Sequence, residues 1–322
     1  MGRPKRRASP KVVNYVNRNL ESLSITMAIG VVKSLNPPWK QEHGKRGRPP
    51  HKSRVVAVCC ILMIVLNKTY DGIEAYLNEN PKIKRRLHVS SIPTHSVIHR
   101  GMQQLPLNYI RFVMRFVTLK YRRVGINAAV DSSGMALSTS SKWFDIRIRR
   151  KSSKKDYLKL HIIADLDNGI ILHFTITGSA RHDSPEFRRL IRPLKHLAKV
   201  MGDAAYSSRK NCKLVASKGG KPYLKFKSNA TGRASGSTEW KVSFSEYSTD
   251  NDAWMAIYHL RSIIESIFGS LKRRWGSALR GRRGWMRRRE MALKVLAYDM
   301  KQVHYLERAQ ELGVSLWQPV PA

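Results

Sequence analysis

The chain has 322 residues, 42% of them apolar, and its 60 Lys and Arg against 22 Asp and Glu give a formal net charge of +38. So large a surplus predicts a polyanionic partner, with nucleic acid the expected one, because Lys and Arg that neutralise phosphates release condensed counterions. The three cysteines have no C-x-x-C spacing, so the composition supports neither a disulfide framework nor a zinc site.

Residues 1–124 are basic and carry helical patterns. Ser9 and Pro10 are typical of a helix start. The apolar run Val55–Leu66 predicts a helix that is buried on all sides and continues through residues 71–77. This run has 12 residues, fewer than the ~18 that a membrane helix needs. The basic start of the chain has no apolar segment of its own, unlike a signal peptide. We therefore expect no membrane segment and a reducing compartment that gives access to DNA.

Two segments of this region are candidates for DNA contact. The linker Asn36–Arg54 contains Arg46-Gly47-Arg48-Pro49, the core of a minor-groove AT-hook, although a plain basic linker has the same composition. The predicted helix Thr94–Leu105 fits either the recognition helix of a helix-turn-helix unit or ordinary bundle packing. The sequence leaves both alternatives open.

The pattern changes at Gly125, after which strands dominate. Three β-branched segments separated by turns predict strands, a fourth strand is expected to end at Asp203, and helices follow the third and fourth strands. The expected strands are 125–137, 157–167, 169–179, 199–203 and 221–230. Asp183 precedes the first of these helices and either caps it or lies beside a site. The strand and helix order predicts an α/β fold.

The last predicted helix of this region, Tyr258–Gly276, has an organised polar face. At about 100° per residue, Tyr258, Arg261, Glu265 and Lys272 fall within a ~60° stripe. A surface helix with an ordinary i,i+4 ion pair is the alternative. Two further acids make this surface-helix alternative less satisfactory, because Asp131 and Asp203 lie at predicted strands in apolar surroundings. A buried carboxylate is costly unless it is paired or binds a metal.

The spacing Tyr-x2-Arg-x3-Glu-x6-Lys resembles the signature of one large class of DDE transposases encoded by prokaryotic insertion sequences. "AVDSSG" and "GDAAYSS" are similar to the two aspartate strands of that family, and "YLKLHIIADLDNGIIL" to the hairpin between them. The resemblance implies an α/β ribonuclease-H-like core, a mixed sheet flanked by helices. We expect this catalytic domain over 125–322, with a short insertion at about 219–252 and C-terminal helices, after an all-helical DNA-binding region over 1–124.

The resemblance also implies the chemistry. Asp131, Asp203 and Glu265 are expected to be catalytic and to hold two Mg²⁺ ions, with Mn²⁺ as a substitute, because hard cations prefer oxygen ligands. Such a pair of ions, ~4 Å apart, stabilises the attacking and leaving oxygens at phosphorus. The enzyme would bind the terminal inverted repeats of its element, cleave DNA at the ends and join the 3′-OH to target DNA. No nucleotide cofactor is expected.

The expected DNA contacts cluster around Glu265. Arg261 and Lys272 would contact phosphates near the cleaved bond, with Tyr258 hydrogen-bonding or stacking beside them. The Arg-rich stretch that includes Arg273 and Arg274 would contact the DNA backbone. Trp254 is expected either to stack on a base or to pack inside the protein.

The expected partner is double-stranded DNA at the element ends and target, bound by a homodimer in a prokaryotic cytoplasm, at the nucleoid. A DNA-binding regulator, an architectural protein and an inactive relic of a transposase remain as alternatives, which metal-dependent cleavage distinguishes.

Overall fold

The computed structural model describes residues 6–39, 50–137 and 157–319. They form two compact units, which are described separately. The α/β unit comprises Tyr121–Leu279, and the helical unit comprises Gly2–Lys120 together with Arg280–Ala322. The first boundary lies close to the expected one at 124. The second was not expected, because residues 280–322 belong with the N-terminal helices and not with the catalytic sheet.

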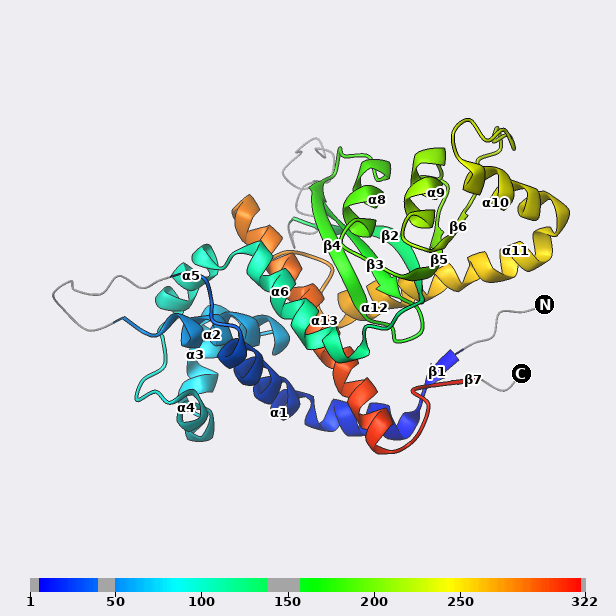
Figure 1. Cartoon of the computed structure of the whole chain (residues 1–322). Coiled ribbons are helices and arrows are strands. Elements are labelled where there is room, and N and C mark those ends of the chain that lie inside the picture. The colour runs from blue at the N-terminus through cyan, green and yellow to red at the C-terminus, as the bar shows by residue number, and fades with distance from the viewer. Residues whose placement is uncertain (1–5, 40–49, 138–156, 320–322) are drawn as a thin grey trace, which may run out of the picture. The chain divides into compact units, whose positions relative to one another are not determined.

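The α/β unit is built on a mixed sheet of five strands (Figure 1). The strands are β2 (Ile126–Ala136), β3 (Tyr157–Asp165), β4 (Ile171–Gly178), β5 (Leu197–Gly202) and β6 (Lys221–Leu224). Their order is β4-β3-β2-β5-β6. The hairpin strands β3 and β4 are antiparallel to their neighbours, whereas β5 and β6 run parallel to β2. Buried β-branched and aliphatic side chains dominate β3 and β4, as a sheet covered on its faces requires. The expected ribonuclease-H-like core is confirmed.

Helices cover both faces of this sheet. The helices of this unit are α8 (Ser184–Ile191), α9 (Arg209–Ala216), α10 (Thr238–Thr249), α11 (Asn251–Tyr258) and α12 (Ser262–Trp275). In Figure 1, α8 and α9 lie over one face of the sheet, and α12 lies over the other. The helix expected over 258–276 is divided, because a 3₁₀ turn, η2 (His259–Arg261), separates α11 from α12. The Ser262 hydroxyl donates to the carbonyl of His259 at 2.9 Å and stabilises this tighter turn.

The expected insertion at 219–252 begins later than predicted, because β6 is part of the sheet. Residues 225–252 contain α10, which the polar composition of this stretch did not indicate. The helix is held by an aromatic cluster in which Phe226 contacts Trp240, Phe244, Tyr247 and Trp254 at ring-centroid distances of 4.9–5.8 Å. Phe226 and the four aromatic rings around it give this segment a core of its own.

The helical unit contains seven α-helices and a small sheet within the described ranges. They are α1 (Pro10–Ser34), α2 (Ser53–Val65), α3 (Tyr70–Asn78), α4 (Pro81–Leu87), α5 (His95–Gln104), α6 (Leu107–Thr118) and α13 (Gly284–Glu311), with a 3₁₀ turn, η1 (Leu119–Tyr121), at its boundary. The strand β1 (Arg6–Ala8) pairs with β7 (Trp317–Pro319). α13 packs against α1, α2, α5 and α6, and its centre is buried on all sides. This packing explains why residues 280–322 belong to the helical unit.

The apolar run at 55–66 forms α2, which is buried on all sides as expected. It does not continue through residues 71–77. Asn67 adopts a left-handed conformation with φ of 53°, and the Thr69 hydroxyl caps a separate helix, α3. In the described part of the chain no helix by itself has the length and apolar character of a membrane span. α2 and α3 taken together do, but they are bent by 111°.

Candidate active site

The register of the sheet brings two of the three expected acids together. β2 and β5 are parallel neighbours in which Val130 pairs with Gly202. Asp131 is the residue after Val130 on β2, and Asp203 is the residue after Gly202. Asp203 is the first residue after β5 and accepts a hydrogen bond from the Ala205 backbone N–H at 3.0 Å. The end of β5 and the middle of β2 therefore present two carboxylates at one place on the sheet.

The third acid is joined to the first through an arginine. Arg261, the last residue of η2, donates from one guanidinium nitrogen to Asp131 Oδ2 at 2.8 Å and from the other to Glu265 Oε1 at 2.9 Å. The side chains of Asp131 and Arg261 are largely buried, with exposed fractions of 18% and 20%, whereas that of Glu265 is 56% exposed. One cation thus lies between two of the expected catalytic carboxylates.

Burial raises the pKa of the Asp131 carboxyl, and the negative charges of Asp203 and Glu265 add to the rise. The Ser132 backbone N–H and Arg261 only partly offset it. Asp131 is therefore a desolvated carboxylate in a region of crowded negative charge. Such a site favours a bound cation, because a second positive charge would offset both the desolvation of Asp131 and its repulsion by the neighbouring carboxylates.

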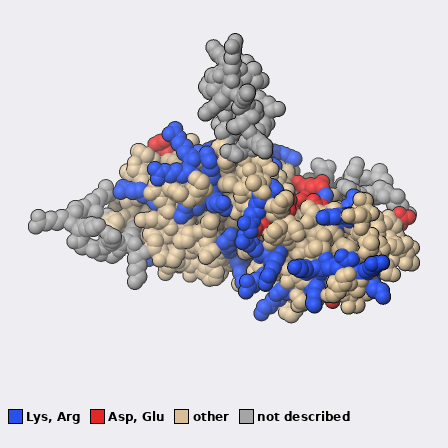
Figure 2. Space-filling model, turned by 90° about the horizontal axis from the view of Figure 1, so that it is seen from above, with Lys and Arg blue, Asp and Glu red and all other residues tan. Residues whose placement is uncertain are grey.

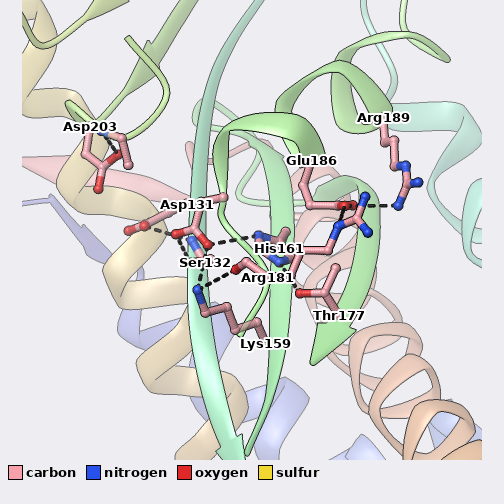
Figure 3. A network of polar contacts seen from close by, with 11 residues as sticks. Asp131, Ser132, Lys159, His161, Thr177, Arg181, Glu186, Arg189 and Asp203 are labelled. Atoms are coloured by element: carbon pink, nitrogen blue, oxygen red, sulfur yellow. Dashed lines mark hydrogen bonds and ion pairs between the residues drawn. The ribbon is translucent and has the colours of Figure 1, made fainter. Parts of the chain in front are cut away.

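A second polar network lies on the opposite face of β2 (Figure 3). Successive residues of a strand point to opposite faces, so the Ser132 side chain lies on the face of β2 opposite to that of Asp131. Ser132 pairs in register with His161 of β3. The Asp183 carboxylate accepts from the Ser132 hydroxyl at 2.9 Å and from Lys159 Nζ at 3.0 Å. His161 is fully buried and contacts Thr177 Oγ1 at 2.8 Å.

Of the two expected roles of Asp183, the structure supports the position beside a site and not the helix cap. It occupies the position before α8, but its side chain makes no capping hydrogen bond. Burial opposes its ionisation, yet the hydrogen bonds from Lys159 and Ser132 hold the pKa of its carboxyl below the usual value. An ionised Asp183 therefore supports the strand that carries Asp131, through the residue next to this expected catalytic position.

Four residues of this region were not singled out in the sequence, namely Ser132, Lys159, His161 and Tyr206. Lys159 and His161 are polar residues at alternate positions of an otherwise apolar strand, which is a detectable signal. Tyr206 is fully buried, and burial raises the pKa of its hydroxyl, with added repulsion from Asp183, Asp131 and Asp203. No pattern in the sequence indicates this tyrosine.

The structure rules out the expected stacking of Trp254 on a DNA base. Its side chain is only 3% exposed, and it packs against Tyr223, Tyr247 and Phe226. It also stacks on Tyr258, with ring centroids 5.7 Å apart and planes 16° apart. A ring enclosed in this way does not stack on a DNA base, so the packing alternative holds. Tyr258 in turn lies beside Arg261, whose guanidinium is 6.0 Å from its ring centroid.

The remaining basic residues lie at the end of α12. Lys272 is half-buried, and burial lowers the pKa of its ammonium group, whereas Arg273 and Arg274 are exposed. Arg46 and Arg48 lie outside the described residues. Figure 2 shows Lys and Arg over wide areas of one face of the molecule, with acidic side chains in a few small areas.

The donor set fits Mg²⁺. Within the described ranges, no three acidic, histidine or cysteine side chains lie close enough to share one ion. Mg²⁺ usually takes only one or two carboxylates and completes its shell with water and substrate phosphates. Asp131 and Glu265 already share a cation, the guanidinium of Arg261, and Asp203 follows the neighbouring strand.

Comparison with known proteins gives a family. Residues 126–300 match the family model described as "Transposase DDE domain", a range that contains Asp131, Asp203 and Glu265. None of the curated proteins matches the chain. Among solved structures, the chain is similar to the cryo-EM structure of a piggyBac transposase synaptic complex with hairpin DNA. The identity is 10% and the TM-score 0.47, over 97% of this chain and 79% of that chain.

Proposed function

The chain belongs to the transposase DDE domain family, and from this premise we propose the reaction that it performs. It binds the terminal inverted repeats of its insertion sequence, cleaves the DNA at the ends and joins the freed 3′-OH to target DNA. The observation that carries this proposal is the bridge from Asp131 through Arg261 to Glu265, with Asp203 on the adjacent strand.

Asp131, Asp203 and Glu265 would hold the metal ions, Mg²⁺ or Mn²⁺. When bound, these ions stabilise the charge that develops on the attacking and leaving oxygens at phosphorus. The chain supplies rigid positions for the carboxylates. Asp131 lies in the middle of a central strand, and the Ser132 backbone N–H donates to its carboxylate. The Ser132 hydroxyl in turn donates to Asp183, which fixes the position of this residue. Glu265, in the first turn of α12, is the most exposed of the three and has the most freedom to adjust.

Arg261 has a second task in this proposal. Its guanidinium would have to release at least one of its two carboxylates for these to hold a metal. A DNA phosphate would then be a suitable new partner, because a guanidinium binds phosphate through two parallel hydrogen bonds. Tyr258 orients it from the side. Lys272 is near enough along α12 to contact the same backbone, and Arg273 and Arg274 present exposed charge beyond it.

The proposed partners are two element ends and a target duplex, held by a homodimer that forms on DNA. Each protomer would supply one complete set of the three carboxylates, since all three come from a single α/β unit. The proposed location is the nucleoid of a prokaryotic cell. The net charge of +38 supports a nucleic-acid partner.

The decisive experiment uses a plasmid that carries this gene with its native flanking DNA. Purified wild-type protein and Glu265→Gln are incubated with it in Mg²⁺, in Mn²⁺ or in EDTA, and strand breaks are mapped to the nucleotide. We expect breaks at two inverted-repeat ends with wild-type protein and metal, and none with the variant or EDTA.

Glu265→Gln keeps the size of the side chain and removes one carboxylate charge. Full cleavage by this variant would overturn the metal-ligand assignment. Tight binding of the ends by wild-type protein, without breaks in any metal, would instead indicate a DNA-binding regulator or an inactive relic.

A further inference from the structure

A cavity of about 350 Å³ opens in the helical unit between the start of α6 and the start of α13. Three arginines line it, Arg111 from α6 and Arg288 and Arg289 from α13, together with Asn108 and Trp285. No carboxylate is among the lining residues. The cavity is therefore a concave surface with a concentrated positive charge.

Arg289 is fixed in this cavity by neutral partners. Its Nε donates to the backbone carbonyl of Leu105 at 2.6 Å, and a terminal nitrogen lies 3.4 Å from the carbonyl of Trp285. Its guanidinium also lies over the Trp285 ring, 5.1 Å from the centroid. These contacts orient the group without neutralising it. Burial lowers the pKa of both Arg289 and Arg111, but a guanidinium remains charged in a protein.

The start of α6 adds to the positive potential. Pro106 is the residue before the helix, and α6 has neither a side-chain cap nor an acidic residue in its first turn. The first N–H groups of a helix and its dipole favour an anion at this end. Leu107 and Asn108, in the first turn, are themselves part of the cavity wall.

We infer that this cavity binds a backbone phosphate of double-stranded DNA. Oriented guanidinium groups and a helix N-terminus together recognise phosphate oxygens, and Trp285 offers an apolar wall for the adjoining sugar. The identity of the polyanion rests on the proposed function, whereas the phosphate chemistry rests on the cavity alone. The cavity would fix the register of the DNA on the helical unit without reading its sequence.

The test measures affinity for a random duplex of about 30 base pairs in EDTA, by fluorescence anisotropy, between about 50 and 200 mM salt. Asn108→Asp places a negative charge in the cavity, next to Arg111, whose guanidinium already donates to Asn108 at 3.0 Å. An acid in the first turn also stabilises a helix, so this variant is expected to fold. Arg111→Ala combined with Arg288→Ala is the second variant. Asn14→Asp, at an exposed position of α1, is the control with the same chemical change.

We expect Asn108→Asp and the double variant each to lose about tenfold in affinity. The slope of log K against log salt should become shallower by about 1, as the loss of one phosphate contact predicts. The control should match wild type. Unchanged affinity and slope in both cavity variants would overturn the inference, as would an equal loss in Asn14→Asp.

A parallel measurement separates DNA from free phosphate. If inorganic phosphate raises the Tm of wild type but not of Asn108→Asp, while both bind DNA equally, the cavity serves a small anion and the inference fails. Because these assays need no element end and no cleavage, their outcome is independent of the plasmid experiment.

Discussion

The two bonds of Arg261 provide a quantitative test of the site. Both are charge-assisted and of nearly equal length, 2.8 Å to Asp131 and 2.9 Å to Glu265, but they differ in solvent exposure. The Asp131 side chain is 18% exposed and the Glu265 side chain is 56% exposed. If burial decides the energy, the two pairs should contribute very different amounts to the stability of the metal-free protein.

The magnitudes follow from this difference. A hydrogen-bonded pair that involves charged groups and is shielded from water contributes about 1.5–3 kcal/mol. An exposed i,i+4 pair contributes only about 0.3–0.5 kcal/mol, because water screens it and two long side chains lose freedom. We therefore expect a coupling free energy several times larger between Arg261 and Asp131 than between Arg261 and Glu265.

The assay is a pair of double-mutant cycles with Arg261→Gln, Asp131→Asn and Glu265→Gln, measured by urea unfolding in EDTA at pH 7. The cycles isolate each pairwise free energy from the effect of the single substitutions. Equal couplings, or a larger coupling to Glu265, would refute the argument from burial. Couplings near zero for both pairs would show that Arg261 does not lie between these carboxylates in solution.

Three further outcomes are expected. Gly101→Ala should lower the free energy of unfolding by about 1–3 kcal/mol in urea titrations, because the new Cβ would lie 2.1 Å from a methyl of buried Val56; adding Val56→Ala should restore most of it, and additive losses would contradict the clash. Asp183→Asn should slow end cleavage about 10–100-fold with DNA affinity unchanged, as loss of a supporting carboxylate does; a wild-type rate would contradict that role. Burial lowers the pKa of His161, so its imidazole takes up a proton in the unfolded chain at a higher pH than in the folded protein. The Tm should therefore decrease as the pH is lowered below about 6.5, and His161→Gln should make the Tm less dependent on pH.

Much of the α/β unit was predictable because its strands are apolar, short and separated by turns. All five strands appear near their expected positions, and Asp131 and Asp203 lie on and just after strands as predicted. Their adjacency depends on β2 and β5 being parallel neighbours. Strand order is a tertiary property, so only the family resemblance pointed to it.

The misses have physical causes as well. A helical wheel assumes one regular α-helix, so it could not show the 3₁₀ turn at His259–Arg261 that directs Arg261 toward Asp131. Trp254 has partners in distant segments, including Tyr223 and Phe226, and a local pattern cannot tell a ring that faces them from one that faces DNA. α13 carries Glu290, Lys294 and Asp299 among its apolar residues, so a local pattern does not predict that its whole centre is buried in the helical unit.

The chain enters the helical unit, leaves it at Lys120, completes the α/β unit and returns at Arg280. The two parts of the helical unit are therefore synthesised at different times, before and after the α/β unit. On the ribosome, α1 to α6 emerge first but lack α13, whose buried side chains complete their core. The sheet and the acids Asp131, Asp203 and Glu265, by contrast, are complete once Leu279 has emerged. A nascent or prematurely terminated product would thus have an assembled α/β unit beside an unfinished helical one.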